Sequence, residues 1–319
     1  MNELRPTPSK LLIVLAFLSV YFCWSATYTA MRIGAELLPA TVFAGVRMVC
    51  GAAIMLPFCA LSGRRIFHGR KIMGRLMLLG VMLLFGGNIG LVWSEKYLSS
   101  GLAALIVAVV PLYVVLIEMF SPRGDRLRPQ GYLGLALGFC ALVALLWPSL
   151  RNGLGGHPMQ ILAIVAILVG AFSWAAGSVL SRRMNLPIDP LVAAGWEMLA
   201  AGVANIFFAT VFWQWPHAIW NWSSVGCIAY LIVFGSLLGF SSYIWLIAHV
   251  PVAKVSTYAY VNPMIAVLLG VLVLHERLAR TEYIGMVAII VSVALVNSSK
   301  LSSGKQVAQV ECVAVESET

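Results

Sequence analysis

Ten stretches of this chain are apolar and long enough to cross a membrane. A helix rises about 1.5 Å per residue, so roughly 20 apolar residues span the hydrocarbon layer. Lipid offers backbone amides no partner, so a spanning segment is a helix or part of a closed barrel, and the alternating pattern of a barrel is missing. The sequence therefore predicts an all-α integral membrane protein. The ten predicted spans cover residues 11–31, 40–61, 73–94, 100–120, 129–147, 159–180, 190–213, 224–248, 253–274 and 281–298.

Composition supports this fold class. Apolar residues make up 61% of the chain and charged residues 10%, and the mean hydropathy is +0.93. Soluble domains are only about half apolar and about a quarter charged. The span that begins at residue 11 is too long for a secretion signal and lacks a small-residue cleavage pattern, so it is predicted to be a retained helix.

The sequence repeats itself after about 150 positions. Moving residues 22–52 onto residues 172–202 superimposes Trp24 on Trp174, Arg32 on Arg182, Gly45 on Gly195 and Arg47 on Glu197. Each half contains five predicted spans, and an odd number makes the second half enter the membrane from the opposite side. The sequence therefore predicts two inverted five-helix repeats related by an axis in the membrane plane.

Five segments follow from this division. The repeats are expected at residues 11–147 and 159–298, and the Gly- and Pro-containing segment 148–158 is expected to link them. Residues 1–10 form a short polar lead, and residues 299–319 form a polar tail that is expected to be disordered.

Basic residues are distributed unequally between the two sides of the predicted bundle. When the termini and every second loop are assigned to one side, fifteen of the 21 Lys and Arg residues fall there, five fall on the other side, and Arg47 lies within a span. The positive-inside rule then predicts that both termini are cytoplasmic. This bias also explains the net charge of +9. A nucleic-acid partner is disfavoured, because no basic cluster carries interleaved aromatic residues or a binding motif.

Arg47 and Glu197 are charges inside apolar spans. The helical rise puts Arg47 about 12 Å from the outer surface and Glu197 about 11 Å from the inner surface, so their depths differ by about 7 Å in a core of about 30 Å. An unpaired charge is costly there, so we expect the two side chains to pair across the pseudo-two-fold axis or each to face a watered cavity. A pair could also be a purely structural device. Glu197 could alternatively carry a coupling proton.

Motifs for enzymatic chemistry are missing from the sequence. It contains no Gly-x-x-x-x-Gly-Lys phosphate loop, no Gly-x-Ser-x-Gly elbow and no His-Glu-x-x-His pair. Its six cysteines show no Cys-x-x-Cys or Cys/His ligand spacing. We therefore expect no enzyme activity, no cofactor and no metal.

Several stretches carry a resemblance to a known family. They are SWAAGSVLSRR at 173–183, TYAYVNPMIAVLLG at 257–270 with Glu276 after it, and the spacing of Trp24 and Arg47 in the first half. With these features, nearly all of residues 11–298 resemble the EamA branch of the drug/metabolite transporter superfamily. The resemblance implies a ten-helix inverted-repeat bundle with a central cavity, in the bacterial inner (cytoplasmic) membrane. One departure is Asp125, where the family pattern leads us to expect Glu.

The resemblance also implies which spans line the cavity, namely the first, third, fourth, sixth, eighth and ninth. Pro111 and Pro263 lie at equivalent positions and are candidate hinges, although either could fix a static bend. Together with the two buried charges, the candidates for substrate binding or gating are Tyr28, Arg47, Asn88, Trp93, Trp174, Glu197, Tyr243, Tyr258, Tyr260 and Asn262.

The resulting hypothesis is a secondary transporter that exports small metabolites, such as amino acids, or drugs by rocking two repeats around a midplane site. A proton or substrate gradient would supply the energy. A zwitterionic amino acid and an amphipathic aromatic compound suit the candidate residues equally well. The alternative is a non-transporting receptor or scaffold with a vestigial cavity. The sequence leaves homo-oligomer formation open.

Overall fold

The computed structural model describes residues 9–120, 129–154, 158–256 and 258–274, together with residues 283–285, 287, 288, 290–292 and 295. This part of the chain is helical and contains no strand. Seven segments in it are long and apolar enough to cross a membrane. They are Lys10–Leu37, Ala40–Leu61, Arg70–Ser94, Ser100–Met119, Pro158–Met184, Pro190–Val211 and Trp222–His249. Half of the positions in the predicted span 281–298 lie outside the described residues.

The helices of the first half follow the predicted spans closely, but two of those spans are subdivided. The elements are α1 Lys10–Leu37, α2 Ala40–Leu61, α3 Arg70–Gly80, the π-helical segment η1 Val81–Gly86, α4 Gly87–Ser94, α5 Ser100–Val107, α6 Val110–Met119 and α7 Pro129–Leu154. Because α7 continues to Leu154, it extends into the segment that the sequence favoured as a linker.

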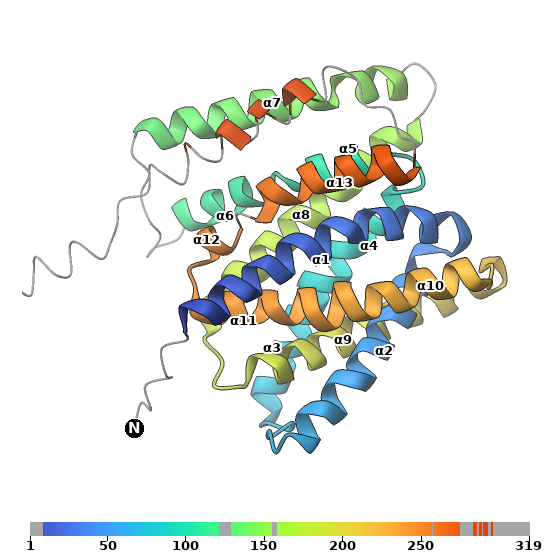
Figure 1. Ribbon diagram of the computed structural model, residues 1–319, viewed down its shortest axis with the longest axis vertical. Helices are drawn as coiled ribbons and strands as arrows, with labels where there is room; N and C mark the ends of the chain where they lie inside the picture. Colours follow the sequence, from blue (N-terminus) through green and yellow to red (C-terminus); the bar gives the residue numbers. More distant parts are fainter. Residues whose placement is uncertain are drawn as a thin grey trace, which may run out of the picture.

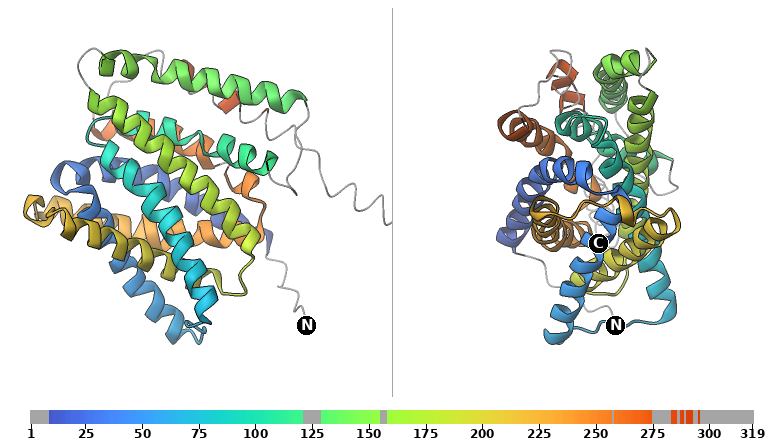
Figure 2. Two further views of the ribbon diagram at one scale, coloured as in Figure 1. Left: turned by 180° about the vertical axis from the view of Figure 1, so that it is seen from behind. Right: turned by 90° about the vertical axis from the view of Figure 1, so that its right-hand side faces the viewer.

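The second half has a similar order of elements. They are α8 Pro158–Met184, α9 Pro190–Val211, the 3₁₀ turn η2 Trp215–His217, α10 Trp222–Tyr230, the π-helical segment η3 Leu231–Phe240, α11 Ser241–His249, α12 Val252–Val255 and α13 Tyr258–Leu274. The helices form one bundle in which α7 and α2 lie at opposite edges (Figures 1 and 2). Beside α7 lie the described residues after position 282, and Ser292 Oγ donates to the Gly134 carbonyl at 2.6 Å.

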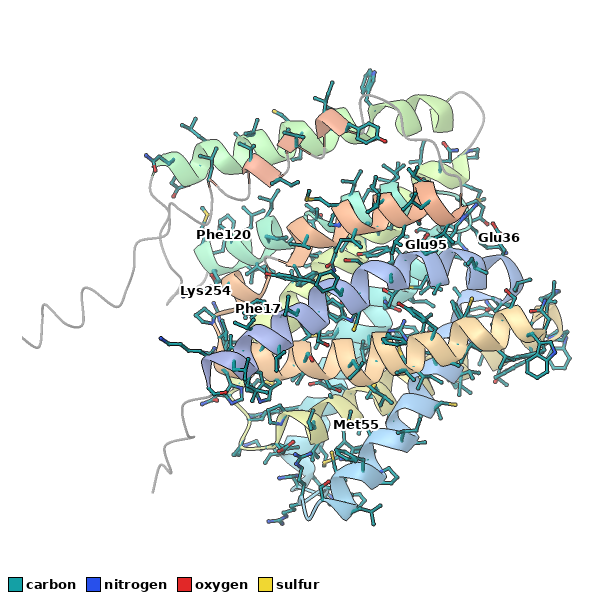
Figure 3. All side chains as sticks on the ribbon, in the orientation of Figure 1. Phe17, Glu36, Met55, Glu95, Phe120 and Lys254 are labelled. Atoms are coloured by element: carbon teal, nitrogen blue, oxygen red, sulfur yellow. The ribbon has the colours of Figure 1, made fainter. Side chains whose placement is uncertain are left out.

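Polar side chains fix several helix starts. Ser9 caps α1 by accepting from the Leu12 amide at 3.2 Å, and Asp189 caps α9 by accepting from the Leu191 amide at 2.9 Å. Such caps satisfy amides that have no partner within the helix. Figure 3 shows where helix ends lie: Glu36 and Glu95 are at one end of the bundle, and Phe120 and Lys254 are at the other.

Helices α2 and α9 pack antiparallel along each other through repeat-related contacts. Gly45 faces Ile206, and Gly195 faces Leu56. Gly45 and Gly195 are 150 positions apart, and so are Leu56 and Ile206. Adding a Cβ at either glycine would bring it within 3 Å of its neighbour, so both glycines allow the close approach of the two helices. This packing has a local two-fold relation.

The π-helical segments lie in equivalent places. The segment η1 begins at Val81 and η3 begins at Leu231, 150 positions later. A π-helical turn inserts an extra residue into the hydrogen-bond ladder, and such turns occur frequently at functional sites. Both segments contain glycine, and each packs against the other half: η1 on α8 and α9, and η3 on α1 and α2.

The two prolines have different local structures. The span 100–120 is interrupted at Ala108 and Val109, and Pro111 lies in the first turn of α6. There the missing N–H costs no helical hydrogen bond. Pro263 instead lies inside α13. The preceding helix α12 ends at Val255, with Ser256 as its C-cap. Equivalent sequence positions therefore give a helix start in one half and an interior position in the other.

Candidate functional site

A cavity that the Arg47 side chain lines is called the Arg47 cavity here. Residues from both halves line it. Five of the predicted candidates do so: Tyr28, Arg47, Asn88, Trp174 and Tyr258.

Arg47 crosses from α2 to the π-helical segment of the second half. Its residue is 5% exposed, and its Nε donates to Ser236 Oγ at 3.0 Å. Gly235 lies beside the guanidinium, because a Cβ at that position would be 3.0 Å from Nη2. Asn88 also lines the cavity, and its Oδ1 is buried without a hydrogen-bond partner among the described residues. The lining thus combines a cation with an unsatisfied amide oxygen.

Aromatic rings form one wall of the Arg47 cavity and continue behind it. The repeat-related Trp24 and Trp174 meet edge to face with ring centroids 5.5 Å apart. Tyr258 packs on Trp24 at 5.2 Å, and Tyr243 packs on both tryptophans at 5.1 and 5.2 Å. These four rings are called the aromatic cluster.

Hydrogen bonds fix the orientation of the aromatic cluster. Trp174 Nε1 donates to the Tyr243 hydroxyl at 3.0 Å, and that hydroxyl lies 2.6 Å from Ser178 Oγ. Trp24 Nε1 donates to the Gly235 carbonyl at 3.1 Å, in the π-helical segment η3. Buried indole and phenol groups that are satisfied in this way hold a single geometry.

Glu197 lines a second cavity, which is called the Glu197 cavity. Its residue is 1% exposed, and its Oε2 has no hydrogen-bond partner in the described part of the chain. The Glu197 backbone packs directly on Gly80, where a Cβ would lie 2.7 Å from the Glu197 Cα. Most of the walls are aliphatic, with Leu76 and Ile244 as examples.

The two buried charges do not pair with each other. Arg32 forms an ion pair with Glu36, and Arg64 forms one with Asp189, whereas Arg47 and Glu197, both of them described residues, do not lie within ion-pair distance of each other. Of the two arrangements expected from the sequence, the pair across the axis is therefore absent, and each charge lines its own cavity.

The two cavities follow one another along the same helices. On α8, Ile167, Ala171 and Trp174 line the Arg47 cavity, whereas Ser181 and Arg182 line the Glu197 cavity. Ser178 lies between these two groups and holds the Tyr243 hydroxyl. The second half shows the same order along the chain: Phe240 in η3 lines the Arg47 cavity, and Ile244 in α11 lines the Glu197 cavity. The Ser178–Tyr243 contact thus lies at the boundary between the cavities.

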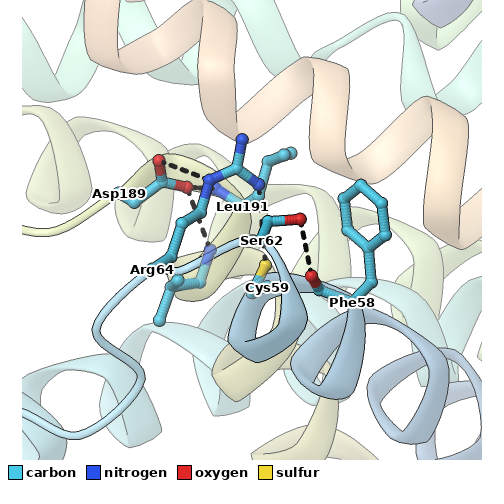
Figure 4. Close-up of polar contacts among 7 residues, drawn as sticks. Phe58, Cys59, Ser62, Arg64, Asp189 and Leu191 are labelled. Carbon is cyan, nitrogen blue, oxygen red and sulfur yellow. Dashed lines mark hydrogen bonds and ion pairs between the residues drawn. The ribbon is translucent and has the colours of Figure 1, made fainter.

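The two ends of the α2–α9 pair carry polar contacts of different chemistry. Arg64 Nε lies 3.2 Å from Asp189 Oδ2, next to the α9 cap (Figure 4). At the other end, Thr41 Oγ1 donates to Gln214 Oε1. Because Gln214 is 150 positions after Arg64, the ionic contact at one end corresponds to a neutral contact at the other.

The remaining predicted candidates lie elsewhere. Trp93 packs on Tyr97 with centroids 4.9 Å apart and lines neither described cavity. The Asn262 carboxamide lies 3.2 Å from Ser25 Oγ and so ties α13 to α1. The Tyr260 side chain is outside the described residues. No group of three or more potential metal ligands occurs in the part of the chain that the structure describes.

Sequence reasoning missed several residues of the Arg47 cavity. Ser236 holds the guanidinium, and Trp24 joins the aromatic cluster. Trp24 had a signal, because it is the repeat partner of the candidate Trp174. Ser236 had none, because one serine in an apolar span does not indicate a contact with another half of the chain.

Comparison with known proteins identifies the family. Residues 11–147 and 161–298 match the EamA-like transporter family. The chain therefore belongs to this family of membrane transporters. It is 33% identical over 287 residues to YedA of Escherichia coli K12, named an uncharacterized inner membrane transporter, with 89% of this chain and 90% of YedA covered. It is 22% identical to the uncharacterized transporter YoaV of Bacillus subtilis 168, with 87% of this chain and 94% of YoaV covered.

A solved crystal structure has a similar fold. The two superimpose with a TM-score of 0.65 over 90% of this chain and 97% of the other, at 21% sequence identity. At this level of identity the likeness concerns the fold alone.

Proposed function

We propose that this chain is a secondary transporter that exports small metabolites, with the Arg47 cavity as its substrate site. The observation that carries the proposal is a cavity between the two halves that combines a buried guanidinium, the partnerless Asn88 oxygen and aromatic walls. A carboxylate would bind Arg47 by charge-assisted hydrogen bonds, and an apolar or aromatic body would lie on Trp174 and Tyr258. Amino acids, amphipathic aromatic metabolites and aromatic drugs have this combination.

The proposed mechanism is alternating access by two inverted five-helix repeats, with ten spans in total. Three observations support it: the family match falls in two blocks, α2 and α9 meet through repeat-related glycines, and the π-helical segments begin 150 positions apart. The bias of basic residues supports cytoplasmic termini, and the naming of YedA supports an inner-membrane location. A gradient of protons or of substrate would supply the energy.

Counterflow in proteoliposomes tests this function. The protein is reconstituted, the vesicles are loaded with unlabelled amino acids or aromatic metabolites, and uptake of the matching labelled compound is followed. We expect exchange of at least one compound, and its loss in Arg47→Gln. A pH gradient across the vesicle then tests whether a proton drives net flux. If folded native protein exchanges no compound of a broad panel, the transporter proposal is wrong and a receptor or scaffold role becomes the one to pursue.

A further inference from the structure

The Glu197 carboxyl group lines a cavity and has an oxygen without a hydrogen-bond partner. This oxygen is Oε2, which is buried, whereas the repeat-related Arg47 is hydrogen-bonded to Ser236. A buried polar atom without a partner costs free energy, so its presence in a folded protein calls for an explanation, and a bound ligand is one. A hydrogen-bond donor or a cation that binds in the cavity would satisfy this oxygen.

Arg182 is the other charged residue that lines the Glu197 cavity, and its charge is already engaged. Its Nη1 donates to the carbonyls of Ile247 and Ala248, at 3.1 and 2.8 Å. These carbonyls lie at the end of α11, where the helix dipole favours a cation. Arg182 therefore caps the C-terminal end of α11 and forms no ion pair with Glu197.

The walls around Glu197 describe the rest of a ligand. They combine aliphatic side chains, such as Leu79 and Ile247, with the polar side chains of Ser181 and Asn185. A small amine that carries an apolar body fits this lining, because its ammonium group can bind the carboxylate while its body contacts the aliphatic part of the wall.

We propose that the Glu197 cavity is a second binding site, which takes the protonated amine of a small organic molecule on the Glu197 carboxylate. Its physiological meaning rests on the proposed function, because the cavity adjoins the Arg47 cavity along α8 and would be a stage on the path to it. A transported amino acid would present its ammonium group to Glu197 in one cavity and its carboxylate to Arg47 in the other. Tyr243, held by Ser178, stands between the two stages.

Direct binding tests the site independently of transport. The probe is phenethylamine, titrated by calorimetry into the full-length protein in lipid nanodiscs, with empty nanodiscs as the blank. The matched probe is 3-phenylpropionate, which has the same ring and the opposite charge. We expect saturable binding of phenethylamine and at least about tenfold weaker binding by Glu197→Gln, the size of a lost charge-assisted hydrogen bond. Phenylpropionate binding should not respond to this variant.

Two further variants locate the probe. Asp189→Asn removes a half-exposed charge near the cavity but keeps an oxygen for the α9 cap, and should change phenethylamine affinity less than about twofold, because exposed charges are screened. Ala193→Leu fills the Glu197 cavity and keeps its charge, and should weaken binding as much as Glu197→Gln. Each variant is used only if its unfolding temperature shows that it is folded.

An affinity for phenethylamine that Glu197→Gln changes less than about twofold would overturn the amine site, as would an equal loss of phenylpropionate binding in the same variant. The function and the site fail separately. If the protein shows counterflow but amine binding does not depend on Glu197, the transporter proposal stands and the second site is wrong. If amine binding depends on Glu197 but no counterflow occurs, the second site stands and the transporter proposal is wrong.

Discussion

Arg47 and Glu197 occupy equivalent positions of the two halves, 150 residues apart, but they are held in different ways. The Arg47 guanidinium is fixed by Ser236, and the atoms nearest to an added Cβ at Gly235 are side-chain atoms of Arg47 and Thr27. Glu197 is fixed at its backbone, which packs on Gly80, and its carboxyl tip has no hydrogen bond among the described residues. Packing therefore fixes the Arg47 guanidinium itself, whereas for Glu197 it fixes the helix backbone and leaves the carboxyl group without a hydrogen bond.

This difference follows from a single pair of residues in the π-helical segments. Ser236 of η3 and Gly86 of η1 are repeat-related positions. A serine there gives Arg47 its partner, whereas at Gly86 an added Cβ would be 3.3 Å from the Ser173 Cβ, so the helices are too close for a side chain. As the two halves diverged, Arg47 gained a hydrogen-bond partner, whereas Glu197 Oε2 has none among the described residues.

The largest predicted effect is that of Gly80→Ala. The new methyl group would overlap backbone atoms of Glu197, which cannot move without separating α3 from α9, and overpacking of this kind costs about 3 kcal/mol. Gly235→Ala should cost less than about 1 kcal/mol, because its nearest neighbour is the flexible tip of Arg47 at 3.0 Å. The thermal unfolding temperature of purified protein in detergent measures both.

Gly74→Ala is the matched control for helix α3. No atom lies within 4 Å of its added Cβ, so the change should only raise helix propensity, by about 0.5–1 kcal/mol. If Gly235→Ala lowers the unfolding temperature as much as Gly80→Ala, the two charges are held alike and the comparison above is wrong.

The intermediate effect is that of Ser236→Ala. It leaves the Arg47 Nε without its partner in a buried site, at a cost of about 1–3 kcal/mol. Glu197→Gln removes no hydrogen bond that the structure shows and should therefore leave the unfolding temperature nearly unchanged. In an Arg47→Met background Ser236→Ala should lose most of its effect, and an unchanged cost there would contradict the assigned contact.

The span pattern and the repeat could be read from the sequence because each depends on local composition. The predicted span 40–61 coincides with α2, and the predicted start at 190 coincides with that of α9. Hydrophobic length sets these limits, and Asp189 marks one of them as a cap. The π-helical segments could not be predicted, because they depend on how η1 and η3 pack against the other half.

The candidate site was partly predictable for the same reason. Polar and aromatic residues in apolar spans are rare enough to be noticed, and Tyr28, Asn88 and Trp174 do line one cavity. Whether Arg47 pairs with Glu197 depended on depth estimates of a few ångströms and on side-chain direction. Two cavities that follow one another along α8 were beyond such estimates, because they depend on how helices from both halves pack.

A second comparison, between the two ends of the α2–α9 pair, concerns smaller energies. Arg64 and Asp189 form an ion pair at one end, and the repeat-related end has the neutral contact of Thr41 with Gln214. The Arg64 and Asp189 side chains are 34% and 37% exposed, so water and salt screen their attraction. The ionic end should therefore be only slightly more stable than the neutral one.

The smallest predicted effect is that of Arg64→Gln, at about 0.2–1 kcal/mol, as for other exposed ion pairs. Asp189→Ala should cost about 1 kcal/mol more, because it also removes the acceptor for the Leu191 amide at the start of α9. Unfolding temperatures at low salt and at about 1 M salt separate the two contributions, since screening acts over about 3 Å at the higher concentration. The effect of Arg64→Gln should vanish there and the cap contribution should persist. If the two variants lose their effects together, the Asp189 side chain acts through its charge alone, and the two ends of the α2–α9 pair differ only by a screened attraction.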